Sequence, residues 1–146
     1  MKKNKRIRLI PTLFCMALFF IASPSISGNA STSWSESATA IEKALNHALS
    51  VYGEGKSEEA TEMVADAYFG LFESEKANME IAVRRFISFK VAAKIEKSFN
   101  KLRKAMHSKE AIKDIEGRTV ALIEEVKKAA IKLDEKGVEM NQEYKR

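Results

Sequence analysis

Cysteine is almost absent from this 146-residue sequence. The single cysteine, Cys15, lies inside an apolar run near the N-terminus, so the rest of the chain contains no thiol. This excludes an intramolecular disulfide, a thiolate zinc site and covalently attached haem. Both prolines, Pro11 and Pro24, also lie within residues 1–30. A domain formed by the remaining 116 residues must therefore be stabilised by burial of apolar side chains, and that length suffices for one core.

Catalytic signatures are lacking as well. The sequence contains no Gly-rich phosphate loop, no Gly-x-Ser-x-Gly elbow and no His-Glu-x-x-His motif. With two histidines and one cysteine, it offers few of the side chains from which catalytic triads are built. We therefore expect a protein that is not an enzyme.

The N-terminus has the three parts of a secretory signal. Residues 1–8 carry five positive charges and no acid, and residues 9–22 (LIPTLFCMALFFIA) form an uncharged apolar run. Residues 23–30 (SPSISGNA) supply the small residues that signal peptidase accepts. The apolar run has 14 residues, whereas a membrane-spanning helix needs roughly 20.

We expect residues 1–30 to be a cleaved signal peptide, with a cut after Ala22, Ser27 or Ala30. The mature chain is then periplasmic or otherwise secreted, with no integral membrane insertion. The alternative is an uncleaved anchor, which leaves the rest of the chain on the same side of the membrane. Lipidation is not expected, because the large pair Leu13-Phe14 precedes the cysteine.

Removing the signal changes the electrostatic balance. The whole chain has 25 Lys and Arg against 20 Asp and Glu, a formal charge of +5. All five excess cations lie in residues 1–8, so the remainder is formally neutral, with 20 of each sign. The basic pI is therefore no sign of nucleic-acid binding, and we expect no nucleic-acid partner.

After a polar, flexible lead-in at 31–37, apolar residues recur at helical spacing almost to the end. They form five segments, at 38–52, 60–72, 79–87, 91–106 and 112–133. Gly53-Glu-Gly55 reads as a helix stop, Ser57 as a helix N-cap, and Ser88 as the start of the fourth segment. Each apolar stripe is one-sided, with charged residues opposite.

This pattern predicts an all-α fold over residues 38–137, followed by a polar tail at 138–146. The short linkers favour antiparallel neighbours, so we expect a four-helix up-down bundle with the short third segment as a connecting helix. Gly117 inside the last segment predicts a kink or a close helix crossing.

Metal binding by carboxylates is the one chemistry that the residues permit. Glu62 and Asp66 are four residues apart on the second segment, so their side chains share a face with the acids that precede them. Such oxygen ligands suit hard cations, including ferric iron. The alternative is that these acids only complement the helix dipole and solvate the surface.

The two histidines and the basic stretches allow similar alternatives. His47 lies between Leu45 and Ala48, near the buried edge of its helix, and is either a ligand or a structural residue. His107 falls where a cation suits a helix C-terminus. Arg84-Arg85 and the basic run 97–104 read as solvated helix faces, with docking of an acidic partner as the alternative.

The central stretch also resembles a known module. The residues that carry the resemblance are Ala65-Asp-Ala-Tyr-Phe-Gly-Leu-Phe-Glu73, Met79-Glu80, Ala82-Val83-Arg84, Ile95-Glu96 and Phe99-x-x-Leu102-Arg103. They are similar to the extracytoplasmic N-terminal domain of many bacterial members of the oxidase-coupled, high-affinity iron permease family. The likeness covers about residues 38–135. The permease's own membrane helices and their Arg-Glu-x-x-Glu motif are absent from this sequence, so the chain resembles a free-standing form of that domain.

The resemblance implies a helical periplasmic domain that serves iron import by receiving iron or presenting it to an inner-membrane iron permease. It makes Glu73, Glu80 and Glu96 candidate iron ligands, whereas Glu62, Asp66 and His47 rest on their own positions. Two other hypotheses remain open at this point. One is a metal-free helical adapter of the cell envelope, in which Glu73, Glu80, Arg84 and Arg103 form ion pairs between helices. The other is a bundle that binds haem without covalent attachment.

Overall fold

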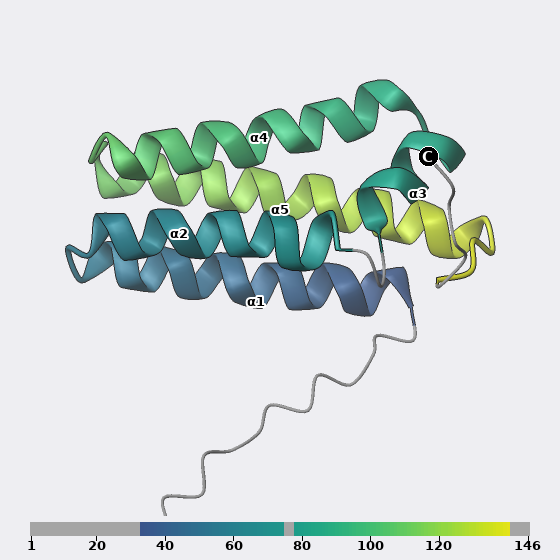
Figure 1. The fold of residues 1–146 in the computed structure, drawn as a ribbon, viewed down its shortest axis with the longest axis horizontal. Helices are drawn as coiled ribbons and strands as arrows, with labels where there is room; N and C mark the ends of the chain where they lie inside the picture. The colour runs from purple at the N-terminus through teal and green to yellow at the C-terminus, as the bar shows by residue number, and fades with distance from the viewer. Residues whose placement is uncertain (1–32, 75–77, 141–146) are drawn as a thin grey trace, which may run out of the picture.

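The structure is a computed structural model that describes residues 33–74 and 78–140 (Figure 1). Within these residues it is all helical, which confirms the predicted fold class, and contains no strand. The elements are α1 (Trp34–Gly53), α2 (Ser57–Ala67), the π-helical turn η1 (Tyr68–Phe72), α3 (Met79–Phe86), α4 (Phe89–His107) and α5 (Ile112–Glu135). The predicted signal peptide and the end of the predicted polar tail lie outside the described residues.

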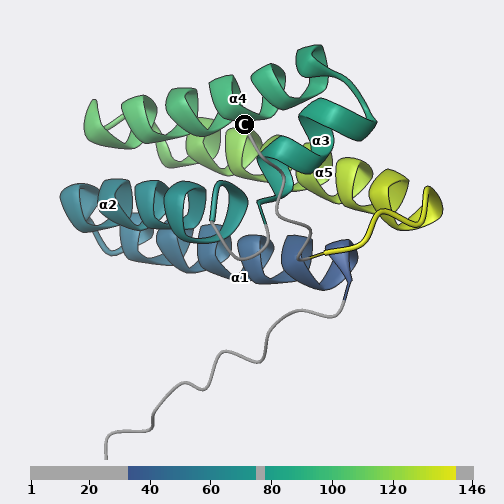
Figure 2. The same cartoon turned by 45° about the vertical axis from the view of Figure 1, so that its right-hand side comes forward.

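The four longer elements, with η1 extending α2, lie side by side in both views (Figures 1 and 2). α1 packs on α2 and α5, and α4 packs on the same two helices from the other side. Followed along the chain, successive long helices run in opposite directions, and the short α3 packs on α4 and α5 near the start of α4 (Figure 1). Their apolar stripes face inward and form one continuous core cluster.

Two of the three predicted helix boundaries match the structure. Ser88 caps α4, because its hydroxyl accepts a hydrogen bond from the Val91 N–H at 3.1 Å. α1 ends at Gly53, and Gly55 adopts a φ of 84°, which is open to glycine without strain. The predicted N-cap at Ser57 is wrong: Ser57 is already the first residue of α2, and Lys56 precedes it without a side-chain cap.

The expected flexible lead-in at 31–37 does not hold for its last four residues. α1 begins at Trp34, whose side chain is completely buried. The Trp34 indole Nε1–H donates to the Val138 carbonyl at 2.6 Å, and the Trp34 backbone N–H donates to the Asp134 carboxylate at 2.9 Å. Val138 and Met140, expected in a polar tail, pack against the core. The helical domain therefore begins before residue 38, because one large aromatic side chain docks on the end of α5.

The expectation of a close helix crossing at Gly117 is also wrong. Gly117 is exposed within an uninterrupted α5, and a Cβ added there has no neighbour within 4 Å. Among the described residues, no helix combines the length and the apolar character needed to span a membrane.

Candidate functional site

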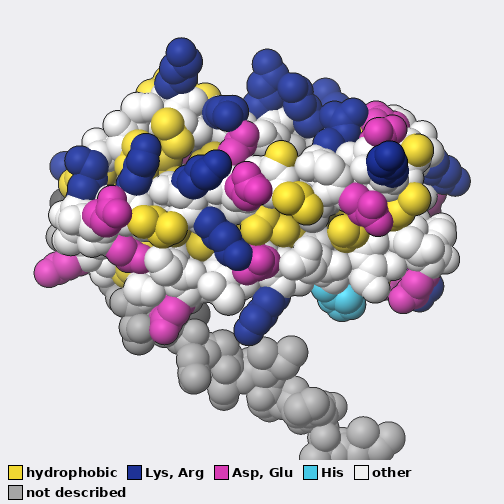
Figure 3. All heavy atoms as spheres, turned by 180° about the vertical axis from the view of Figure 1, so that it is seen from behind, with side chains coloured by type: hydrophobic (Ala, Val, Ile, Leu, Met, Phe, Trp, Pro, Cys, Tyr) yellow, Lys and Arg dark blue, Asp and Glu magenta, His cyan; other side chains and the backbone are white. Residues whose placement is uncertain are grey.

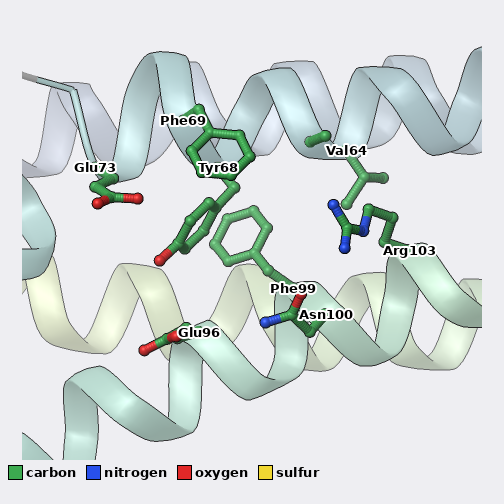
Figure 4. A pocket seen from close by; sticks show the side chains of 9 residues that line it. Val64, Tyr68, Phe69, Glu73, Glu96, Phe99, Asn100 and Arg103 are labelled. Atoms are coloured by element: carbon green, nitrogen blue, oxygen red, sulfur yellow. The ribbon is translucent and has the colours of Figure 1, made fainter.

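The candidate site is a pocket of about 320 Å³ between α2–η1 and α4 (Figure 4). Aromatic rings form its walls, two carboxylates lie at one end, and a guanidinium lies at the other (Figure 4). The side chains labelled in Figure 4 are those of Val64, Tyr68, Phe69, Glu73, Glu96, Phe99, Asn100 and Arg103. This combination gives the pocket both an apolar surface and opposite charges at its two ends.

The π-helical turn η1 builds one wall of the pocket. The Glu73 N–H donates to the Tyr68 carbonyl at 2.8 Å, a bond that spans five residues instead of four. Single π-turns inside helices are rare and occur frequently at functional sites. The Tyr68 ring lies edge-on to Phe69 at 4.9 Å and to Phe99 at 5.3 Å between ring centroids. These contacts hold the ring between η1 and α4.

The hydroxyl of Tyr68 points towards the acidic end of the pocket (Figure 4). Burial raises the pKa of the Tyr68 phenol well above its usual range, and the carboxylates of Glu73, Glu96 and Glu80 raise this pKa further. Because all three carboxylates act on one phenol, its surroundings favour the protonated hydroxyl and, equally, a cation placed beside it.

Arg84 connects two of these carboxylates. Glu80 is buried, and its carboxylate forms an ion pair with the Arg84 guanidinium one helical turn away. The same guanidinium lies 3.9 Å from the Glu96 carboxylate and 4.9 Å from the centre of the Phe89 ring. Arg84 therefore neutralises part of the negative charge and ties α3 to α4.

Of the three glutamates that the resemblance indicates, Glu73 and Glu96 line the pocket and Glu80 lies beside it on Arg84, whereas the other three candidate ligands lie elsewhere. Glu62 is exposed and lines a second pocket near Arg103 and His107. Asp66 is exposed on α2. His47 is exposed on α1, so its expected position at a buried edge is wrong. In the part of the chain that the structure describes, no three His, Cys, Asp or Glu side chains are grouped closely enough to hold a metal ion by themselves.

Sequence reasoning missed Tyr68 as a site residue, because it assigned this ring to the core. One signal was present in the sequence: Tyr68-Phe-Gly-Leu-Phe72 has apolar residues at more positions than one face of an α-helix can bury. Comparisons of the chain with protein-family models, with curated proteins and with solved structures find no match.

Proposed function

We propose that this chain is a periplasmic accessory module of iron uptake, which binds iron weakly through carboxylates and presents it to an inner-membrane iron permease. In this proposal the four long helices form an up-down bundle, and α3 connects its two halves. Export rests on the signal-like residues 1–30, and the iron assignment rests on the resemblance together with the pocket.

One observation carries the proposal: Glu73 and Glu96 come from different elements, yet they line the same pocket, with the Tyr68 hydroxyl at the same end (Figure 4). The two carboxylates are hard oxygen donors, which ferric iron prefers over nitrogen or sulfur. Glu80 lies close enough to influence the same phenol, but it is already paired with Arg84.

The arrangement suits a carrier better than a store. Two carboxylates leave most coordination positions of an iron ion to water or to a partner, so the ion can leave again. The 3.9 Å approach of Arg84 to Glu96 also places a competing cation beside the site. Both features favour weak, reversible binding, which delivery to a second protein requires.

Isothermal titration with ferrous and ferric ions tests the proposal. We expect Glu73→Gln and Glu96→Gln each to weaken iron binding at least about tenfold. The matched control is Glu58→Gln, which removes the same charge from an exposed position at the start of α2. Equal binding by all three variants would reject the proposed ligands.

A metal-free adapter is the second candidate, and the Arg84 contacts favour it. A guanidinium that bridges Glu80 and Glu96 satisfies part of the acidic cluster without any metal. The pocket would then recognise a side chain of a protein partner. Recovery of the same partner by affinity capture with and without a strong chelator, together with no heat signal from iron, supports this candidate over the first.

A further inference from the structure

α4 carries a regular row of lysines on its outer face. The row consists of Lys90, Lys94, Lys97, Lys101 and Lys104, and all five side chains are exposed. At 100° per residue their spacing of four, three, four and three residues confines them to about 80° of arc, over a length of about 21 Å. The buried residues of α4, such as Ile95 and Leu102, lie on the opposite side of the helix. We call this surface the lysine row.

The lysine row makes the molecule electrically polar. α4 contains six Lys and Arg and one acid, Glu96, which gives a formal charge of +5. Its neighbour α2 contains four acids and no basic residue, a charge of −4. Blue side chains gather along the upper edge of the molecule, where α4 lies (Figure 3). Within residues 33–74 and 78–140, Lys94 is the one member of the row that forms an ion pair, with Glu125 at 2.9 Å.

The chemistry of the row indicates what kind of surface it fits. Lysines are flexible point charges that lack the planar fork with which arginine recognises a single carboxylate or phosphate. A straight row of them matches a broad, diffuse negative charge better than one defined anionic group. Phe89, at the start of the same helix, is 63% exposed and adds an aromatic ring next to the row. Helices that lie in the interface of a bilayer bury Trp, Phe or Leu side chains at the boundary between headgroups and acyl chains.

We propose that the lysine row docks this domain on the surface of an anionic phospholipid bilayer, with α4 lying along the membrane and Phe89 at the headgroup level. Because α2 is acidic, any orientation that turns α2 towards the anionic bilayer is disfavoured. This inference is independent of iron binding, because it uses none of the proposed ligands. It would place the candidate pocket, which α4 borders, close to the membrane.

Binding to vesicles tests the proposal with the full chain. We expect stronger co-sedimentation with phosphatidylcholine vesicles that contain phosphatidylglycerol than with pure phosphatidylcholine. Each lysine near an anionic surface contributes about fivefold to partitioning, so the triple variant Lys90→Gln, Lys97→Gln, Lys101→Gln should bind anionic vesicles about a hundredfold more weakly. Added salt should remove the same component of binding.

A control with the same charge change removes three exposed lysines from other helices: Lys43→Gln, Lys113→Gln, Lys132→Gln. If both triple variants lose binding equally, net charge alone explains the effect and the lysine row is not a docking face. Unchanged vesicle binding by the α4 variant also overturns the proposal. Binding of the lysine row to an acidic protein, without binding to vesicles, overturns it as well.

Residues 1–30 are basic and apolar, which are properties that also attach a chain to an anionic vesicle. The side of the domain that faces the bilayer therefore needs its own measurement. In a Cys15→Ser chain, a fluorophore is attached through Lys97→Cys on α4 or through Glu59→Cys on α2. Quenchers fixed to lipid headgroups should reduce the signal at position 97 and leave position 59 bright. Equal quenching at both positions would mean that another segment holds the chain on the vesicle.

Discussion

Trp34 provides a stringent test of how the domain begins. Its side chain is completely buried, its indole donates to the Val138 carbonyl, and its backbone N–H donates to Asp134. These contacts fix the first turn of α1 on the last turn of α5. Replacing a buried tryptophan by alanine removes this packing and leaves a cavity, at a cost of about 3–5 kcal/mol.

The expected effect of Trp34→Ala is large for a domain of this size. Native domains have a total stability of about 5–15 kcal/mol, and a loss of about 4 kcal/mol lowers the Tm by roughly 15–30 °C. Trp34→Phe keeps most of the ring but loses the indole N–H, so a smaller cost of about 1–2 kcal/mol is expected.

Urea unfolding followed by far-ultraviolet circular dichroism measures both effects. The matched control is Ile131→Ala, an apolar truncation at a half-exposed position of α5, which should change stability by no more than about 0.5 kcal/mol. If Trp34→Ala costs less than about 1 kcal/mol, residues 34–37 are not docked in solution and the described start of α1 is wrong.

Three further predictions concern a glycine, an ion pair and the pocket tyrosine. Gly117→Ala should stabilise the protein by up to about 1 kcal/mol in thermal unfolding, since the added methyl group meets no neighbour and alanine favours the helix; a loss of stability would contradict the open surroundings of Gly117. Arg84→Gln should lower the free energy of unfolding, measured in urea, by about 1–3 kcal/mol, because it leaves the buried Glu80 without its charged partner. As the control, Arg118→Gln breaks a half-exposed ion pair and should lower it by about 0–1 kcal/mol. Equal losses in the two variants would refute this difference. Because the pKa of Tyr68 is raised in the folded state, the stability of the protein should fall as the pH rises above about 10, where the unfolded chain releases this proton more readily. Urea unfolding midpoints across that range should fall less in Tyr68→Phe. Identical pH profiles of the two proteins would argue against the raised pKa.

The sequence predicts the helical class and most helix positions well, because one-sided apolar stripes such as those of α4 and α5 are a local signal. The start of α1 could not be predicted in the same way. Trp34 stands among serines, and its burial depends on Asp134 and Val138, which are about a hundred residues away. A tertiary contact of this kind leaves no periodic pattern in the sequence.

The candidate site shows the same limit. The pairing of Glu80 with Arg84 follows from their spacing of four residues on one helix. The approach of Glu96 to Arg84, and the position of Tyr68 among the carboxylates, depend on how α3, α4 and the π-helical turn pack together. Candidate ligands chosen by spacing alone, such as Glu62 and Asp66, lie elsewhere on α2 because one helix face does not determine which neighbouring helix supplies the remaining ligands.

Paramagnetic line broadening tests the central claim most directly, because it locates a bound metal as well as detecting it. In ¹⁵N–¹H correlation spectra, small additions of ferric iron in a soluble weak chelate broaden the amides closest to the bound ion. We expect the first amides to broaden to be those of residues 68–73 and 96–100, and the broadening to disappear in the double variant Glu73→Gln, Glu96→Gln. Broadening that starts at the acids of residues 58–66, or that is unchanged in the double variant, would contradict the proposed iron site.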